Sequence, residues 1–275
     1  GCVTLRSAVH RGCKGIVPAA GVARRIAPLP CSKEILPLVY GGSVSRWGTH
    51  VGTPIHYLLH QMCVAGAERT YVVIRPEKRD IPDFLCNGGQ GLGELDYIVT
   101  PGTAGVPFTV DLALAQAGDD VVLFGFPDIL VQQQDVYLRL LDRLAGGDDD
   151  LLLGVFPATA PSQEDLVALD ARGNVGRIEI KPRHPGKLDL AWMLAVWRPE
   201  FSRFVRDWVQ CTGRDLAAAG PEAPEPQFGD VINAAIHQGV AVGAEIFKAS
   251  YLDIGTPGHL ARAPQFAARI DKQVR

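Results

Sequence analysis

The sequence has 275 residues, of which 47% are hydrophobic and 21% charged, so it can bury a core without disulfides or structural metals. Its formal net charge of -3 excludes the global positive field that holds nucleic acid, and no apolar run is long enough to cross a membrane. The six cysteines form no C-x-x-C pair, which is typical of a reducing compartment. We therefore expect a cytoplasmic protein whose partners are neither nucleic acid nor membrane, and in which any bound anion is held by a local cluster of cations.

Residues 1–14 carry basic side chains that interrupt any apolar stretch, so we interpret them as an N-terminal extension and not as a signal peptide. From residue 15 onward, β-like runs alternate with helical patterns, which predicts an α/β fold with a mixed, mainly parallel sheet flanked by helices. A hairpin is expected at 166–182 around Gly173-Asn174, and a surface segment at 220–226. The strands are expected at 15–20, 70–75, 96–100, 121–126, 151–156, 193–197 and 241–247, and the helices at 54–65, 80–85, 106–117, 135–144, 200–211, 230–238 and from 257 onward.

The first candidate functional segment, 19–33, directly follows the first expected strand, at the sheet edge where α/β proteins bind ligands. Small residues let backbone N–H groups approach a phosphate closely, and basic residues supply positive charge. The alternative is a tight turn with solvated arginines, and no G-K-[ST] follows that would make it a P-loop. The small or apolar residues are Ala20, Gly21, Val22 and Ala23, and the basic residues are Arg24, Arg25 and Lys33.

Two aspartates occupy similar places later in the chain. Asp128 follows the apolar run 121–126, and Asp253 follows an apolar residue shortly before the last expected helix. A carboxylate at the end of a buried strand can hold a hard divalent cation. Taken singly, each aspartate is also explained as a turn residue or a helix cap.

Together these segments resemble the sugar-1-phosphate nucleotidyltransferases of the glucose-1-phosphate thymidylyltransferase and uridylyltransferase type. The pattern A-G-G-x-G-T-R-L-x-P-L-T of that family corresponds to residues 19–30, and its P-K-x-L-L-P segment corresponds to 32–37. Further similar pieces follow in family order at 80–82, 128, 179–182, 229–233 and 253–257. The resemblance implies one Rossmann-like domain over 15–275, with a nucleotide-binding part to about 130 and a β-rich sugar-binding and closing part thereafter.

The resemblance also implies a reaction, in which a sugar-1-phosphate attacks a nucleoside triphosphate and releases pyrophosphate. Arg25 and Lys33 would neutralise the triphosphate, Asp128 and Asp253 would hold Mg²⁺, and Lys181 would hold the sugar phosphate. The loop 20–24 would bind the nucleotide, with dTTP or UTP as the default. Members of the family commonly form homo-oligomers, so self-association is expected.

The sequence departs from the family pattern where the substrates are bound. Thr100 stands where a glutamine usually reads the base, while Gly105 matches the glycine whose backbone faces the base. On the sugar side, Glu179 and Lys181 match the pattern, but Ile180 replaces a carboxylate. Trp192 is a candidate for stacking on the sugar, with a core position as the alternative. The sugar is therefore not necessarily glucose.

Three other interpretations stay open. A cytidylyltransferase that acts on another phosphate substrate would share most of these motifs. A non-catalytic homologue that binds nucleotide sugars would be expected to lose a metal aspartate or the loop lysine, and this chain keeps them. A dehydrogenase is disfavoured because no G-x-G-x-x-G follows the first strand. His56 and His60 lie four residues apart on an expected helix, but no third metal ligand is identifiable, which favours a core or surface role.

Overall fold

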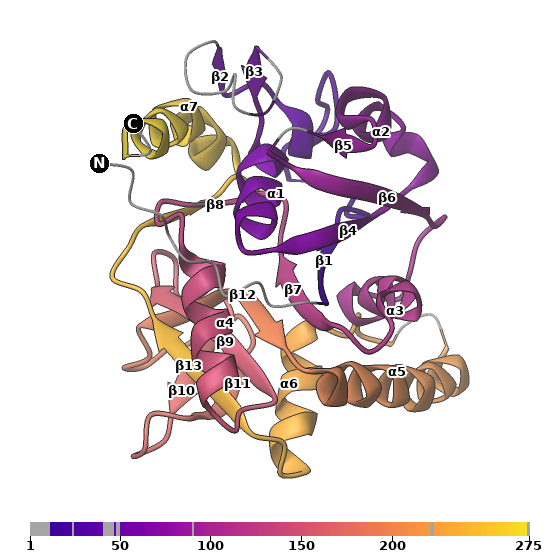
Figure 1. Ribbon diagram of the computed structural model, residues 1–275. Helices are drawn as coiled ribbons and strands as arrows, with labels where there is room; N and C mark the ends of the chain where they lie inside the picture. The colour runs from indigo at the N-terminus through magenta and orange to yellow at the C-terminus, as the bar shows by residue number, and fades with distance from the viewer. Residues whose placement is uncertain are drawn as a thin grey trace.

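The computed structural model describes residues 12–23, 25–40, 47, 50–89, 91–220 and 223–273 (Figure 1). The described residues form a ten-stranded mixed sheet in the order β11-β10-β12-β7-β1-β4-β6-β5, with β9 pairing with both β12 and β13. Strands β7, β1, β4 and β6 are parallel to one another, which confirms the expected sheet. The strands of this half are β1 (Cys13–Pro18), β4 (Ala67–Ile74), β5 (Gly88–Gly89), β6 (Gly93–Val99) and β7 (Val121–Gly125).

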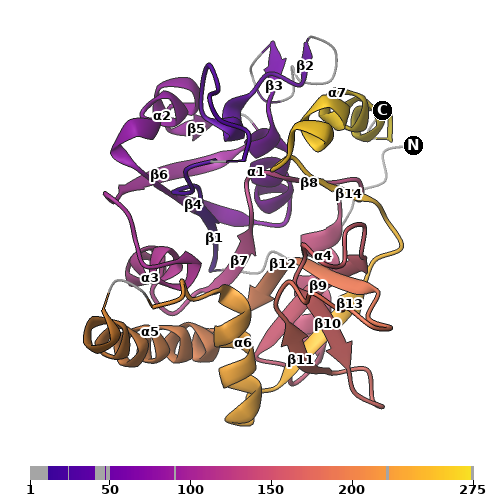
Figure 2. The same cartoon turned by 180° about the vertical axis from the view of Figure 1, so that it is seen from behind.

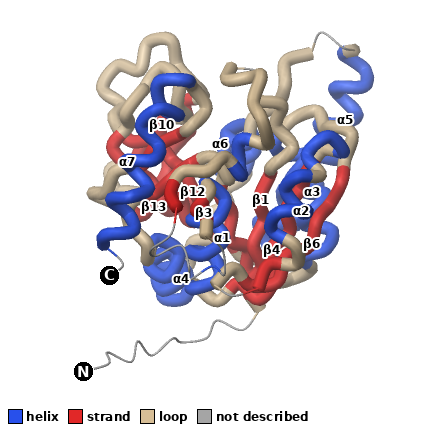
Figure 3. Tube along the Cα trace, turned by 90° about the horizontal axis from the view of Figure 1, so that it is seen from above, coloured by secondary structure: helices blue, strands red, loops and turns tan. Residues whose placement is uncertain are grey.

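The second half of the sheet is mainly antiparallel and contains the expected hairpin. Figure 3 shows β10, β12 and β13 of this half on one side of the molecule and β1, β4 and β6 on the other. Its strands are β9 (Leu151–Pro157), β10 (Leu166–Leu169), β11 (Val175–Glu179), β12 (Leu190–Trp197) and β13 (Val242–Ile246). Two small ladders lie beside it, β8 (Ile129–Val131) with β14 (Tyr251–Asp253), and β2 (Val39–Tyr40) with β3 (Val51–Gly52). The ladder of β8 and β14 brings the two candidate metal aspartates onto neighbouring segments.

Helices cover both faces of the sheet (Figures 1 and 2). They are α1 (Pro54–Val64), α2 (Asp80–Leu85), α3 (Val106–Ala117), α4 (Val136–Gly146), α5 (Pro199–Ala219), α6 (Phe228–His237) and α7 (Pro257–Gln273), with short 3-10 turns η1 (Lys33–Ile35) and η3 (Pro76–Lys78). None of the described helices has both the length and the apolar character that crossing a bilayer requires.

Alternation along the central strands divides the core into two layers. Val17 and Leu123 pack toward α1, α4 and α7, whereas Ile16, Val122 and Phe124 pack toward α3, α5 and α6. All five residues are fully buried, as expected for a parallel sheet covered on both faces.

Most element boundaries fall within a few residues of expectation, and 80–85 and 106–117 match α2 and α3. Helix α5 extends eight residues beyond the predicted end at 211, to Ala219. The first strand begins at Cys13 and not at residue 15, so Cys13 and Lys14 belong to the sheet and not to an extension. The rest of the predicted extension, 1–11, lies outside the described residues.

His56 is a core residue and not a metal ligand. The backbone N–H of Thr53 donates to its Nδ1 at 3.2 Å, which caps the start of α1, and the Trp47 ring stacks on it at 4.9 Å between ring centroids. Burial lowers the pKa of His56 to about 4. Protonation of Nδ1 would remove the acceptor that caps the helix, so the neutral form is required for the folded state.

The free energy of unfolding should therefore fall on acidification. Because the pKa of His56 is lowered on folding, its contribution is complete above pH 6.5 and is lost as the pH falls from 6.5 toward 4, on the order of 3 kcal/mol in total. The free energy of unfolding would be measured with urea at pH 7 and pH 4.5. It should fall less between these two pH values in the His56→Gln variant than in the parent chain. His237→Gln, at an exposed position, should leave the pH dependence unchanged. An equal loss in the parent chain and His56→Gln would contradict this account.

Candidate active site

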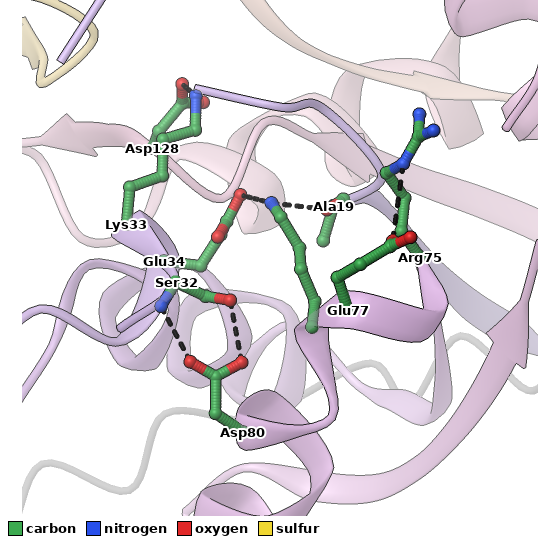
Figure 4. A network of polar contacts seen from close by, with 9 residues as sticks. Ala19, Ser32, Lys33, Glu34, Arg75, Glu77, Asp80 and Asp128 are labelled. Carbon is green, nitrogen blue, oxygen red and sulfur yellow. Dashed lines mark hydrogen bonds and ion pairs between the residues drawn. The ribbon is translucent and has the colours of Figure 1, made fainter. Parts of the chain in front are cut away.

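The site begins at the carboxyl ends of β1 and β7, which are neighbouring parallel strands. The Lys33 ammonium forms an ion pair with the Asp128 carboxylate, across 95 residues of sequence (Figure 4). The Lys33 and Asp128 side chains are only 14% and 16% exposed. Burial lowers the pKa of Lys33, but the charge and hydrogen bond of Asp128 outweigh it, so the pKa lies above its usual value. The lysine therefore stays charged at the sheet edge.

Asp253 joins this pair through the short ladder between β14 and β8. In that ladder Asp253 lies opposite Ile129, and the N–H of Ile254 donates to the Asp128 carbonyl at 3.0 Å. Burial raises the pKa of Asp253, and the negative charge of Asp128 raises it further, whereas Lys33 and Arg25 act in the opposite direction. The structure thus brings the two aspartates together with Lys33.

The Arg25 guanidinium completes the cluster. A Cβ on Gly255 would lie 2.7 Å from an Arg25 guanidinium nitrogen and 2.9 Å from an Asp253 carboxylate oxygen. Glycine at position 255 thus permits the guanidinium and the carboxylate to pack against the same stretch of backbone. The Gly255 N–H also donates to Asp253 at 2.7 Å, which fixes one carboxylate oxygen.

Two cavities meet at this charged cluster. The first has a volume of about 540 Å³ and lies over the loop after β1. The second, of about 450 Å³, lies over the β10–β12 half of the sheet. Both are lined by Arg25, Val106, Phe126 and Asp128, so the charged cluster stands where the two cavities adjoin. Two adjoining cavities of this size have room for two small ligands, one in each.

The structure brings most of the expected site residues to these cavities. The residues that line the first cavity include Ala20, Gly21, Val22, Ala23, Arg25, Lys33, Gly105 and Asp128, and those of the second include Arg25, Asp128, Lys181, Trp192 and Asp253. Arg24 lies outside the described residues, so its expected nucleotide contact stays a prediction.

Two expected site residues line neither cavity. Thr100 is buried, and its hydroxyl donates to the Gly102 carbonyl at 3.2 Å, so it stabilises its own turn. Glu179 pairs with Arg177 at 2.7 Å on β11. The neighbouring Ile180 faces α6, because a Cβ on Gly229 would lie 2.8 Å from an Ile180 carbon. The base-facing and sugar-facing roles of Thr100 and Glu179 therefore gain no support from the geometry.

A buried ion pair behind the loop was not anticipated from the sequence. Glu34 is 1% exposed and accepts from the Lys78 ammonium at 2.6 Å, and Lys78 also donates to the Ala19 carbonyl at 2.8 Å. Burial raises the pKa of Glu34, which the Lys78 charge opposes. The pair ties the end of β1 to the turn that carries Lys33. Both residues lie in single-turn helices too short to show periodicity, which explains why no sequence signal revealed them.

Two further hydrogen bonds hold the same turn at Ser32, the residue before Lys33. Asp80 accepts from the Ser32 N–H at 2.6 Å and from the Ser32 hydroxyl at 2.7 Å (Figure 4). Lys33, the next residue, is thus fixed on both sides by contacts from the segment that includes Lys78 and Asp80. The position of its ammonium is consequently set by the fold and not by a flexible loop.

Comparison with known proteins supports the fold. No family model matches the sequence. A protein from Bacillus anthracis, assigned as a glucose-1-phosphate thymidylyltransferase and solved in complex with sucrose, superimposes with a TM-score of 0.76 at 18% identity, over 93% of this chain and 95% of that chain. A UTP-bound UGPase from Acinetobacter baumannii gives 0.72 at 17% identity, over 92% of each chain, and a UDP-glucose pyrophosphorylase from the same organism gives 0.71 at 18%, over 91% of each. The chain therefore has the fold of these nucleotidyltransferases over nearly its whole length.

Ala23 in the loop after β1 adopts a backbone conformation that L-residues avoid, with φ at 50°. This conformation costs about 1–2 kcal/mol for a residue with a Cβ. Glycine at this position would remove the backbone strain but would add conformational entropy to the unfolded chain. Because the first effect offsets the second, Ala23→Gly should leave the free energy of unfolding unchanged or raise it by about 1 kcal/mol. The matched change Ala217→Gly, at an exposed position in α5, should lower it by about 1 kcal/mol in the same urea titration. Equal destabilisation by both changes would show that the loop carries no strain.

Proposed function

We propose that the protein is a Mg²⁺-dependent nucleotidyltransferase that condenses a sugar-1-phosphate with a nucleoside triphosphate. The products are a nucleotide-sugar and pyrophosphate. The observation that carries the proposal is the convergence of Arg25, Lys33, Asp128 and Asp253 where two cavities adjoin. Each cavity is large enough for one substrate, and the cluster lies where the two phosphate groups would have to meet.

The residues fit a magnesium ion. Within the described parts of the chain, no group of three or more His, Cys, Asp or Glu side chains is arranged to hold a metal by itself. Magnesium needs fewer, because it usually binds one or two carboxylates and completes its shell with water and substrate phosphates. Asp128 and Asp253 would hold it. Burial and, after it, the negative charge of Asp128 raise the pKa of Asp253, and a cation beside the two carboxylates would offset both effects. When bound, the ion would neutralise phosphate oxygens that gain charge during the reaction.

The remaining groups of the site suit the substrates. A phosphate oxygen of the sugar-1-phosphate would attack the α-phosphorus of the triphosphate, and the bond to the bridging oxygen would break to release pyrophosphate. Lys33 and Arg25 would offset the charge of the triphosphate and of the leaving group. Lys181, which lines the second cavity, would hold the sugar phosphate. No general base is required, because the attacking oxygen is already ionised.

The base would occupy the first cavity, above the start of α3. The Thr103 and Thr109 hydroxyls lie within 2.7 Å of each other there, and Gly105 lines the same wall. We propose UTP or dTTP as the nucleotide, on the strength of the uridylyl and thymidylyl neighbours. Thr100 does not line the cavity, so these threonines and the backbone around Gly105 are the groups we propose to contact the base.

Asp128→Asn should lower turnover by orders of magnitude without unfolding the protein, because the amide cannot neutralise a metal ion. Lys33→Ala should have a similar effect, because the triphosphate loses a fixed cation. Pyrophosphate release would be measured with Mg²⁺ for a panel of sugar-1-phosphates paired with the five common nucleoside triphosphates. Circular dichroism and urea unfolding would report the fold.

The matched controls are Asp207→Asn and Lys272→Ala, at exposed positions on α5 and α7. Both should keep full turnover. Near-normal turnover in folded Asp128→Asn would refute the metal assignment. If pyrophosphate is released only with CTP and a different phosphate compound, those are the substrates and the proposed ones are wrong. If nucleotide binds but no pyrophosphate is released with any pair, the protein is a binding protein and not an enzyme.

A further inference from the structure

The second cavity contains a cross-strand pair, Asp165 and Trp192. Leu166 of β10 lies opposite Ala191 of β12 in an antiparallel ladder. The backbone N–H of Trp192 donates to the backbone carbonyl of Asp165 at 3.4 Å. Residues directly opposite each other in such a ladder project their side chains to the same face, with Cβ atoms roughly 5 Å apart. Both residues line the cavity.

Each of these side chains has a buried polar atom without a partner among the described residues. These atoms are Asp165 Oδ1, an acceptor, and the Trp192 indole Nε1–H, a donor. Trp192 is 4% exposed. A buried polar group left without a hydrogen bond costs about 1–3 kcal/mol, so two of them side by side in a cavity wall call for a ligand.

The neighbouring carboxylate, Glu164, has hydrogen-bond donors in the described structure, unlike Asp165 Oδ1. Glu164 accepts from the Thr159 hydroxyl at 2.9 Å and from the Tyr251 hydroxyl at 2.6 Å, and backbone N–H groups of 159 and 160 also donate to it. Its hydrogen-bonding capacity is therefore taken up by the protein. Asp165, the next residue, differs, because its Oδ1 is buried and accepts no hydrogen bond within the described parts of the chain.

Asp165 also lies near the expected phosphate-binding lysine, Lys181, and both residues line the second cavity. Lys181 has a φ of 41°, an unfavourable value for a residue with a Cβ. Burial raises the pKa of Asp165, which the Lys181 charge opposes and the Asp230 charge reinforces. Asp165 therefore adjoins the place where a phosphate attached to a sugar ring would bind.

An aromatic wall completes this part of the cavity. The Trp192 ring centroid lies 5.7 Å from that of Phe126 and 6.0 Å from that of Phe228, and all three residues line the cavity. Aromatic rings offer a flat apolar surface, and a pyranose ring has apolar C–H faces and a polar rim of hydroxyls. A hydroxyl both donates and accepts a hydrogen bond, so one group satisfies a free acceptor and a free donor together.

We propose that Asp165 Oδ1 and Trp192 Nε1 bind the same ring hydroxyl of the sugar-1-phosphate and thereby select the sugar. This inference rests on the proposed function, since it assigns the second cavity to the sugar. The hydroxyl would donate to Asp165 and accept from Trp192. A sugar phosphate that lacks this hydroxyl, or carries it in the opposite configuration, would leave both groups unpaired.

The first test observes the indole directly, without catalysis. In ¹⁵N-labelled protein the four tryptophans give four indole N–H signals, and Trp192→Phe assigns one of them. Titration with glucose-, galactose-, mannose- or N-acetylglucosamine-1-phosphate should shift the Trp192 signal for the sugar that binds. The Trp197 signal is the internal control, because that indole already donates to the Ser202 hydroxyl at 2.9 Å within the core. It should stay in place.

The second test uses monodeoxy analogues of the sugar phosphate that the protein accepts. In the parent protein, removal of one particular hydroxyl should lower kcat/KM by about 10- to 100-fold. In Trp192→Phe and in Asp165→Asn, removal of the same hydroxyl should lower kcat/KM by a smaller factor than in the parent, because each variant has already lost or weakened one of the two bonds to it. The KM for the nucleotide should be unchanged in both variants. Trp208→Phe, in α5 away from the cavities, and Asp207→Asn are the matched controls and should behave as the parent.

The outcomes separate this inference from the proposed function. The inference would be overturned if a sugar-1-phosphate is turned over while the Trp192 signal does not shift. It would also be overturned if Trp192→Phe and Asp165→Asn alter the response to removal of different hydroxyls. Either result would leave the proposed nucleotidyltransferase reaction unaffected. A shifted Trp192 signal without pyrophosphate release from any pair of substrates would support the binding site and refute the reaction. If no sugar-1-phosphate binds, both are wrong.

Discussion

The site depends on one physical constraint, which is that two negative charges are held close together at one sheet edge. Asp128 and Asp253 lie on neighbouring segments of the β8–β14 ladder, and Lys33 is paired with Asp128. Two half-buried carboxylates repel each other, and this arrangement is tolerable only with cations nearby. In the described structure Lys33 and Arg25 supply that charge. The same arrangement would favour a divalent ion and polyphosphate, so the cations that balance the site's carboxylates are also groups that the proposed reaction would use.

The charged groups stay in place because the surrounding structure is rigid. The Glu34–Lys78 pair and the Ser32–Asp80 contacts fix the turn that carries Lys33, and they connect it to the end of β1 and to α2. A buried ion pair contributes little net stability, since desolvation offsets much of the attraction. Its consequence here is positional. Removing either partner would leave an unpaired charge behind the loop, so the pair fixes one arrangement of the backbone around the first cavity.

The sequence predicted the parts of this architecture that show long periodic patterns. Segment 106–117 matches α3, and the apolar run 121–126 identified β7 and the aspartate beyond it. It did not reveal β8 and β14, because strands of three residues are too short to alternate visibly. Thr100 was expected at the base by position alone, but a short-range hydrogen bond in its own turn determines its orientation. The role of Asp165 depends on its pairing across strands with Trp192, and no local pattern contains that information.

The two cavities differ in their linings, with small loop residues and charged side chains around the first and more aromatic side chains around the second. The proposed roles of the two cavities meet at Asp128 and Asp253, which we propose to hold one metal ion together with the triphosphate. The most direct measurement is anomalous diffraction from crystals grown with UTP and Mn²⁺. The account predicts one manganese peak within coordination distance of both carboxylates and of the triphosphate. Triphosphate density in the first cavity with manganese distant from Asp128 and Asp253 would contradict it.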